Sequence, residues 1–277
     1  MFAVVTDSTA YFSREQATNS KVTIVPMSYT IASVKYSEHY ADGNADFLVA
    51  INARPAECKT SQPNVSAYEA TFKRILDNDL DILVVTASSR LSGSFDGAVA
   101  ALNNINAPKD RVAIFDSLNV AAGQKILVDE AVRLSNLGVS LLEAIQKLGE
   151  MRSQINMVFS VESMDALRRG GRIGAVKLSI GKLLNVRPIL QLKDGAVIGE
   201  RTVRGVSNII RELALVIPKD AKKITLMCVG DARASKTIQI LKEHLSNHKN
   251  AEYIEYQDIG PILSIHLGDG AFGIGWL

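Results

Sequence analysis

Short apolar segments that end in clusters of polar residues constrain the fold of this chain most strongly. Asp81–Thr86 is apolar and β-branched, which is typical of a strand covered on both faces of a parallel sheet. Serines, Gly93 and a helix predicted over 95–104 follow at once. In open α/β sheets ligands bind at the carboxyl ends of strands, and helix starts offer unpaired N–H groups to anions. The segment therefore predicts a ligand site, although Ser92 could equally be a plain helix N-cap.

The same order of strand, polar turn and helix recurs through the first half of the chain. Strands are predicted at 2–5, 21–31, 81–86 and 111–115, and helices at 46–53, 66–77, 95–104, 120–135 and 140–151. A further helix should begin at Ser13, because Gln16 completes a capping box. Repetition of this kind predicts a three-layer αβα domain with a mostly parallel sheet over residues 1–153.

The pattern changes near residue 153. Strands are predicted at 156–161, 188–192, 196–202, 223–230 and 252–258, and helices at 162–169, 175–184, 207–216 and 234–244. Lys193, Asp194 and Gly195 form a hairpin signal between two of these strands. Residues 154–277 therefore predict a C-terminal two-layer α+β domain with a mixed or antiparallel sheet. The tail is glycine-rich around His266.

Composition excludes several classes of function. The 31 basic and 29 acidic residues leave a net charge of +2, so no global field attracts nucleic acid or a membrane. No segment approaches the roughly 20 apolar residues of a membrane helix, and the start lacks the features of a signal peptide. Cys58 and Cys228 lie too far apart to indicate a disulfide framework or a zinc ribbon. A reducing cytoplasm is expected.

A serine hydrolase is one possible function. Ser92, His266 and either Asp7 or Asp116 would supply a nucleophile, a base and an orienting acid. The G-x-S-x-G elbow is missing, however, and a lone histidine is more often structural. No Walker motif occurs and no G-x-G-x-x-G directly follows a predicted strand, so no nucleotide is implied.

Basic and histidine clusters offer two weaker possibilities. Arg168, Arg169 and Arg172 surround a glycine pair and could bind phosphate, a protein or nucleic acid, or simply be exposed arginines at a capped helix. His244 and His248 have the spacing of a helical metal pair but lack the accompanying glutamate of a metalloprotease. A solvated helix end is the expected explanation, and no metal site is predicted.

Four motifs taken together resemble the DegV family of bacterial fatty-acid-binding proteins. They are TSQPN at 60–64, SSRLSGSF at 88–95, GGRIG at 170–174 and IGPILSIHLGDGAFGIGW at 259–276. The opening VVTDST, the Asp116-Ser117 pair and the Val203-Arg204 step also look like that family. Each motif alone is weak, but four in the expected order across the whole chain are specific.

The resemblance implies a lipid carrier without catalytic residues, cofactor or metal. One long-chain fatty acid of the palmitate, stearate or oleate class would lie in an apolar tunnel, with its carboxylate at the interdomain site. The tail, 259–277, would return to that site. A partner fatty acid kinase that resembles dihydroxyacetone kinases would supply ATP and convert the bound acid to an acyl phosphate. Neither nucleic acid binding nor stable membrane insertion is expected.

The resemblance also implies roles for individual residues at the matching positions of the motifs. The head-group contacts fall on Thr60, Ser61, Ser92, Gly93 and His266. Four arginines are expected near the ligand mouth or on the partner surface, namely Arg168, Arg169, Arg172 and Arg204.

The chain also departs from the family pattern at several positions. Asn64 replaces a serine, Arg90 a small residue, Ser94-Phe95 a Thr-Tyr pair and Asp269 a proline. None of these changes removes a head-group hydroxyl or the histidine. Arg90 and Asp269 do alter the charge beside the expected site, so the fit of ligand and partner depends on them.

Overall fold

The computed structural model describes residues 1–43, 46–108, 110–174, 176, 185–248 and 254–277. The chain divides into unit 1 (1–30, 35–43 and 60–154) and unit 2 (31–34, 44–59 and 155–277). The chain crosses from unit 1 to unit 2 for the last time between residues 154 and 155. The boundary predicted from the sequence lies one residue earlier, between residues 153 and 154. Unit 1 is discontinuous, because 31–34 and 44–59 belong to unit 2. That each half folds as an independent domain stays a prediction.

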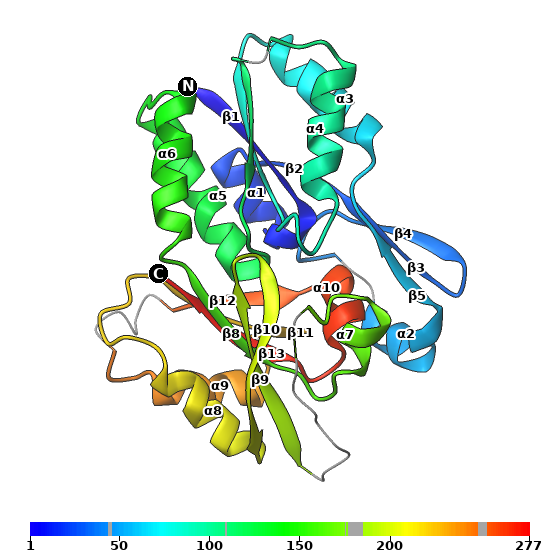
Figure 1. Ribbon diagram of the computed structural model, residues 1–277, viewed down its shortest axis with the longest axis vertical. Helices are drawn as coiled ribbons and strands as arrows, with labels where there is room; N and C mark the ends of the chain where they lie inside the picture. The colour runs from blue at the N-terminus through cyan, green and yellow to red at the C-terminus, as the bar shows by residue number, and fades with distance from the viewer. Residues whose placement is uncertain (44–45, 109, 175, 177–184, 249–253) are drawn as a thin grey trace. The chain divides into compact units, whose positions relative to one another are not determined.

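A four-stranded parallel sheet in the order β2-β1-β6-β7 forms the centre of unit 1 (Figure 1). Its strands are β1 (Phe2–Asp7), β2 (Thr23–Val25), β6 (Asp81–Thr86) and β7 (Val112–Asp116). The helices that contact it are α3 (Val65–Leu76), α4 (Ser94–Asn104), α5 (Ala121–Asn136) and α6 (Leu141–Arg152). The predicted αβα domain with a parallel sheet is confirmed.

Strand alternation explains why this sheet is covered on both faces. Ile82 and Val84 pack in one core cluster with side chains of α3 and α4. Leu83 and Val85 are buried too, and alternation turns them to the opposite face, where α5 and α6 contact β6. A strand buried on both sides must be apolar throughout, which is the pattern that the sequence shows.

Between β1 and α3 the chain is less regular. Helix α1 (Arg14–Ser20) has the predicted capping box, and α2 (Phe47–Ala53) begins after Asp46 as expected. The predicted strand 21–31 is interrupted at Pro26, whose missing N–H cannot join a ladder. A small sheet in the order β4-β3-β5 was not predicted; its strands are β3 (Met27–Ile31), β4 (Val34–Glu38) and β5 (Cys58–Ser61).

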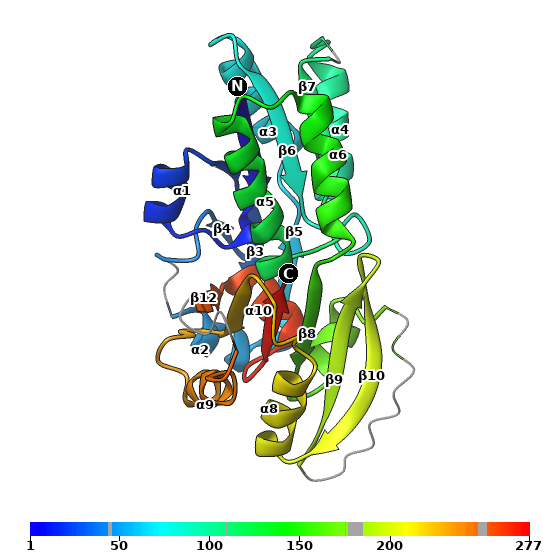
Figure 2. The same cartoon turned by 90° about the vertical axis from the view of Figure 1, so that its left-hand side faces the viewer.

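Unit 2 contains a six-stranded mixed sheet in the order β10-β9-β8-β13-β11-β12. The strands are β8 (Asn156–Ser160), β9 (Val186–Lys193), β10 (Ala196–Arg204), β11 (Ile224–Val229), β12 (Ile254–Ile259) and β13 (Phe272–Trp276). Strands β11 and β12 pair in parallel, and the other described pairings are antiparallel. Helices α8 (Val206–Leu215) and α9 (Lys236–His244) form a core with one face of this sheet (Figure 2). The predicted mixed sheet is confirmed.

The tail contributes two elements that the sequence did not predict. Helix α10 (Pro261–Leu267) carries His266, and β13 is an inner strand of the sheet. Helix α10 contacts α2 and the short helix α7 (Asp165–Arg169). All of the helix predicted over 175–184 except residue 176 falls outside the described residues. None of the described helices combines the length and apolarity that a bilayer crossing requires.

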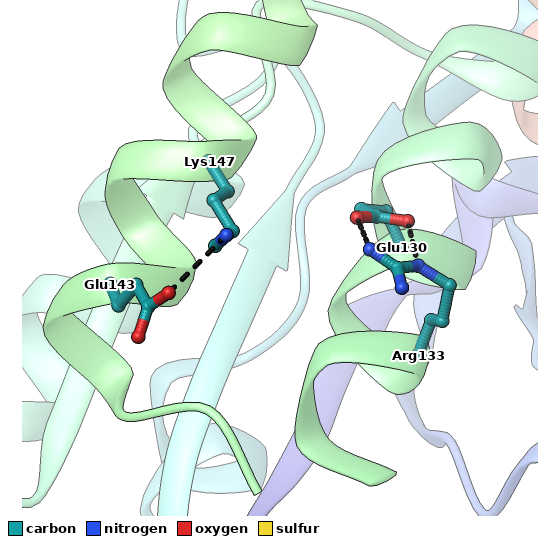
Figure 3. A network of polar contacts seen from close by, with 4 residues as sticks. All are labelled: Glu130, Arg133, Glu143 and Lys147. Atoms are coloured by element: carbon teal, nitrogen blue, oxygen red, sulfur yellow. Dashed lines mark hydrogen bonds and ion pairs between the residues drawn. The ribbon is translucent and has the colours of Figure 1, made fainter. Parts of the chain in front are cut away.

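Two surface ion pairs stabilise helices of unit 1 without joining them (Figure 3). In α5, Arg133 donates to both carboxylate oxygens of Glu130, at 2.8 and 2.7 Å. In α6, Lys147 Nζ is 3.2 Å from Glu143 Oε1. Each pair lies within a single helix, with i, i+3 spacing in α5 and i, i+4 spacing in α6.

Candidate functional site

Residues 88–93, here called the β6–α4 loop, contain the candidate ligand contacts Ser92 and Gly93 of unit 1. The N–H groups of Leu91 and Ser92 both donate to the Ser88 carbonyl at 3.0 Å, which gives the loop a tight turn. Ser92 Oγ accepts from the Ser94 N–H at 3.2 Å. Gly93 is the N-cap residue of α4, so the expectation that Ser92 occupies that position is wrong. Ser92 caps the helix from one residue earlier, because its side chain reaches the first helical N–H.

Unused donors gather where this loop enters α4. Among the described residues, no group accepts a hydrogen bond from the N–H of Gly93 or Phe95 or from the Ser92 hydroxyl. Helix α4 has 11 residues, so its first turn presents a partial positive charge as well as open N–H groups. Such donors favour an anionic group.

The TSQPN segment meets this loop within unit 1. A Cβ placed on Gly93 would lie 1.8 Å from Gln62 Oε1, and one on Gly97 would lie 3.1 Å from Gln62 Nε2. The side chain of Gln62 therefore occupies the space that both glycines leave open. Thr60 and Ser61 are at the end of β5, with Thr60 partly buried and Ser61 exposed. Gln62 was not singled out from the sequence, although it lies inside the TSQPN motif.

A fully buried carboxylate joins the two ends of the β6–α4 loop. Asp7 Oδ2 accepts from the Ala87 N–H at 2.7 Å and from the Ser94 hydroxyl at 2.6 Å. Asp7 Oδ1 accepts from Thr9 N at 3.2 Å, Thr9 Oγ1 at 2.6 Å and Gln124 Nε2 at 3.1 Å. These bonds connect β1, β6, α4 and α5. The sequence points to Asp7 only as a possible triad acid; its position at the end of β1 was the available signal.

Tyr68 extends this network from α3. Its hydroxyl lies 2.8 Å from Ser94 Oγ. Burial, and then the charge of Asp7, raise the pKa of Tyr68 well above its usual value, so the side chain is a neutral phenol. Because the single hydroxyl hydrogen of Ser94 is donated to Asp7, the Tyr68 hydroxyl is the donor to Ser94.

A separate group of candidate residues lies in unit 2; it consists of His266, Gly170 and Arg172 and is here called the His266 cluster. The His266 side chain is only 8% exposed. A Cβ on Gly170 would lie 2.1 Å from His266 Nδ1 and 2.9 Å from Cε1, so the imidazole fits because position 170 has no side chain. Burial, with a smaller effect of the Arg172 charge, lowers the pKa of His266 to about 4. The imidazole is therefore neutral near pH 7 and acts as a hydrogen-bonding group without a charge.

The four predicted arginines differ in their surroundings. Arg172 is partly buried beside His266, and its Nη1 donates to the Gly170 carbonyl at 2.6 Å. Arg168 and Arg169 are exposed in the last turn of α7, where Arg168 is 3.2 Å from Asp165. Arg204 is exposed at the end of β10 and, in the part of the chain that the structure describes, its guanidinium makes no ion pair.

Arg90 and Asp269, the two departures from the family pattern that change the charge, have different environments. Arg90 is exposed within the β6–α4 loop. Asp269 Oδ2 accepts from Asn52 Nδ2 at 3.0 Å, and Asp269 Oδ1 accepts from the Gly270 N–H at 2.7 Å. Asp269 therefore connects the loop after α10 to α2, which a proline at this position could not do through its side chain.

The carboxylates considered for a catalytic triad are already used elsewhere. All five donors to Asp7 come from backbone, threonine, serine and glutamine groups. Asp116 Oδ1 accepts from the N–H groups of Ser89 and Leu118, at 3.1 and 2.9 Å. Within the described ranges, neither carboxylate accepts from a histidine. The same ranges hold no cluster of three His, Cys, Asp or Glu side chains suited to a metal ion.

Comparison with known proteins places the chain among relatives of the same length. A DegV domain-containing protein of Halalkalibacterium halodurans is 28% identical over 278 residues, covering 99% of this chain and 97% of the relative. A Thermus thermophilus structure, described as fatty acid binding of a DegV family protein, has 25% identity and a TM-score of 0.87 over 99% of this chain and 98% of that one. Bacillus subtilis DegV, described as a fatty acid binding protein, has 25% identity and a TM-score of 0.78 with the same coverage.

The family model agrees with these relatives. The model of the DegV family, whose description calls its members uncharacterised proteins, matches residues 1–277. The match includes all four motifs, the β6–α4 loop and the His266 cluster. Because the family model spans the whole chain, the chain belongs to the DegV family.

Proposed function

We propose that this protein is a carrier that binds one long-chain fatty acid. Its carboxylate would be held by Thr60, Ser61, Ser92 and Gly93 of unit 1 and by His266 of unit 2. The observation that carries this proposal is the set of open donors at Ser92, Gly93 and Phe95. Two relatives that are 25% identical over almost their whole length are described as binding fatty acids, which supports the choice of anion.

The acyl chain and the carboxylate of such a ligand would contribute differently to its binding free energy. Burying about 15 methylenes at roughly 0.8 kcal/mol each gives on the order of 12 kcal/mol, less the free energy of ordering the chain and forming the complex. Each hydrogen bond to the carboxylate contributes about 1.5 to 3 kcal/mol against its desolvation. The acyl chain thus supplies most of the affinity, in an apolar tunnel, and the head group fixes the orientation.

Neutral donors suit a carboxylate that must react afterwards. A serine hydroxyl, a backbone N–H and an imidazole with a pKa near 4 hold the acid without a permanent salt bridge. A buried arginine clamp would bind more tightly but would withdraw charge from the oxygen that attacks. This supports delivery of the bound acid to a partner fatty acid kinase, which brings its own ATP and forms an acyl phosphate. Arg168, Arg169, Arg172 and Arg204 are the candidates for contact at the ligand mouth or with that partner.

We propose that the carrier protein itself catalyses no reaction. A histidine with a pKa near 4 is a weak general base at neutral pH, and Asp7 and Asp116 are engaged with other donors. These observations disfavour the esterase alternative based on Ser92 and His266. We place the protein in the cytoplasm, in keeping with Cys58 and Cys228, which are both free thiols.

Extraction of the purified protein with organic solvent, followed by mass spectrometry, tests the proposal. We expect close to one long-chain fatty acid per chain, and uptake of palmitate or oleate after delipidation. Recovery of no fatty acid, before or after incubation with these acids, would contradict the proposal. Ser92→Ala should reduce lipid content and kinase turnover. Ser89→Ala is the matched control, because it removes an exposed hydroxyl from the same loop without removing a proposed contact.

A further inference from the structure

We propose that Asp7 is a positioning residue that holds the β6–α4 loop in the shape that binds a carboxylate. This inference rests on the proposed function and goes beyond it, because Asp7 does not touch the ligand in this account. The bound acid would meet Ser92 and Gly93, whereas Asp7 fixes where those two residues lie. Ser94 is the side chain through which Asp7 acts.

The geometry of one oxygen atom supports this role. Asp7 Oδ2 accepts from Ala87 N–H and from Ser94 Oγ, which belong to the residues that flank the loop on either side. The loop is therefore closed on a single atom, at 2.7 and 2.6 Å. Closing both ends removes conformations in which Ser92 and Gly93 point elsewhere, so less entropy is lost when the ligand binds.

The rest of the carboxylate is held just as firmly. Its other oxygen accepts from Thr9 and from Gln124 of α5, and Gln124 Nε2 also donates to Thr6 Oγ1 at 3.0 Å. In the part of the chain that the structure describes, no lysine or arginine pairs with Asp7. The buried charge is satisfied by neutral donors alone, which fixes its position from several elements at once.

The Asp7 carboxylate and the carboxylate of the bound acid would therefore use different hydrogen-bond donors in and beside the same loop. Ala87 N–H and the Ser94 hydroxyl are used by the resident Asp7, whereas Gly93 N–H, Phe95 N–H and the Ser92 hydroxyl remain for the incoming acid. If Ser94 loses its hydroxyl, Asp7 Oδ2 loses a charge-assisted hydrogen bond inside the protein. A loop donor would then turn inward to replace it, because an unsatisfied buried carboxylate oxygen is costly.

Ser94→Ala tests this idea, with Ser94→Thr as the variant that restores a hydroxyl. Ser135→Ala is the matched control: Ser135 is also buried in unit 1, and its hydroxyl bonds the N–H and carbonyl of Phe2 at the opposite end of β1. Oleate affinity of the delipidated proteins is measured by calorimetry, and hydrogen exchange is measured over 88–93. We expect Ser94→Ala to weaken binding by about tenfold or more, and Ser94→Thr to remain within about threefold of the parent protein.

The control separates positioning from general stability. Ser135→Ala should lower the unfolding temperature yet leave oleate affinity and exchange over 88–93 unchanged. Equal affinity of Ser94→Ala and the parent protein would overturn the inference, and so would an equal loss in Ser135→Ala. If the parent protein binds no oleate, the proposed function fails by itself. Exchange over 88–93 then still decides whether Asp7 and Ser94 fix the loop.

Discussion

The β6–α4 loop of unit 1 and the His266 cluster of unit 2 prepare hydrogen-bonding groups in different ways. The loop is shaped by directed hydrogen bonds that converge on Asp7, at 2.6 to 3.2 Å. His266 is in addition closely packed against Gly170, which has no side chain where the imidazole lies. We therefore expect the loop to be sensitive to the loss of a single hydroxyl group, and the position of His266 to be sensitive to the addition of a single methyl group.

The two glycines at these places show the contrast most directly. Gly93 faces the end of Gln62, an exposed side chain that can move away. Gly170 faces His266, which is buried and has little freedom to move. The same substitution should therefore have a large effect at position 170 and a small one at position 93.

Gly170→Ala should have the largest effect. The new methyl group would lie 2.1 Å from His266 Nδ1, so the imidazole must shift. We expect a loss of about 1 to 3 kcal/mol in the unfolding free energy of unit 2 and a drop of about tenfold or more in oleate affinity. Urea unfolding followed by fluorescence of Trp276, the single tryptophan, reports on unit 2. Gly149→Ala is the control, since a Cβ there meets nothing within 4 Å; similar behaviour of both variants would refute the packing account.

The pH dependence of unit 2 should come next in size. Burial lowers the pKa of His266 from its ordinary value of 6.5 to about 4 in the folded protein. The unfolded chain therefore binds more protons between these values, so stability is complete above about pH 6.5 and falls as the pH drops toward 4. We expect a loss of about 2 kcal/mol between pH 7 and pH 5, measured by Trp276 fluorescence in urea. In His266→Gln this part of the pH dependence should vanish; if it persists, another group is responsible.

Gly93→Ala should have the smallest effect. Its backbone angles, φ −78° and ψ 14°, suit alanine, and the nearest obstacle is the Gln62 side chain, with Oε1 at 1.8 Å and Cδ at 2.7 Å from the new Cβ. We expect oleate affinity to fall by about threefold, and the double variant Gly93→Ala/Gln62→Ala to recover most of it. A large loss that the second substitution fails to relieve would show that Gln62 is not what limits position 93.

The parallel sheet of unit 1 could be predicted from local sequence because its strands are apolar on both faces. The strand Asp81–Thr86 has the predicted bounds, and α4 begins within one residue of the expected start. Strand β13 could not be predicted in this way, because glycines interrupt its apolar pattern. Gly273 belongs there for a tertiary reason: a Cβ would lie 2.6 Å from the Cβ of Phe159 on β8. Pro261 was the neglected signal for α10, since proline is favoured in the first turn of a helix.

The candidate site shows the same limit. Ser92, Gly93 and His266 are predicted as ligand contacts because they lie in motifs that can be read along the chain; this stays a prediction. The contact of Ser94 with Asp7 joins residues 87 positions apart, so no local pattern contains it. The place of His266 likewise depends on Gly170, which is a neighbour only in the folded chain. The motifs thus supply the proposed ligand contacts, whereas the hydrogen bonds and packing behind the proposed positioning required the structure.

Recognition of a carboxylate is the central claim, and a competition experiment tests it most directly. Delipidated protein is loaded with a fluorescent fatty acid, which is then displaced by oleate or by methyl oleate. The two competitors share the acyl chain, but only oleate carries a charged carboxylate, which in the proposed function would accept from Ser92 and Gly93. We predict that oleate displaces the probe at a concentration about tenfold or more below that of methyl oleate, and that Ser92→Ala narrows this difference. Equal displacement by both competitors would contradict the account.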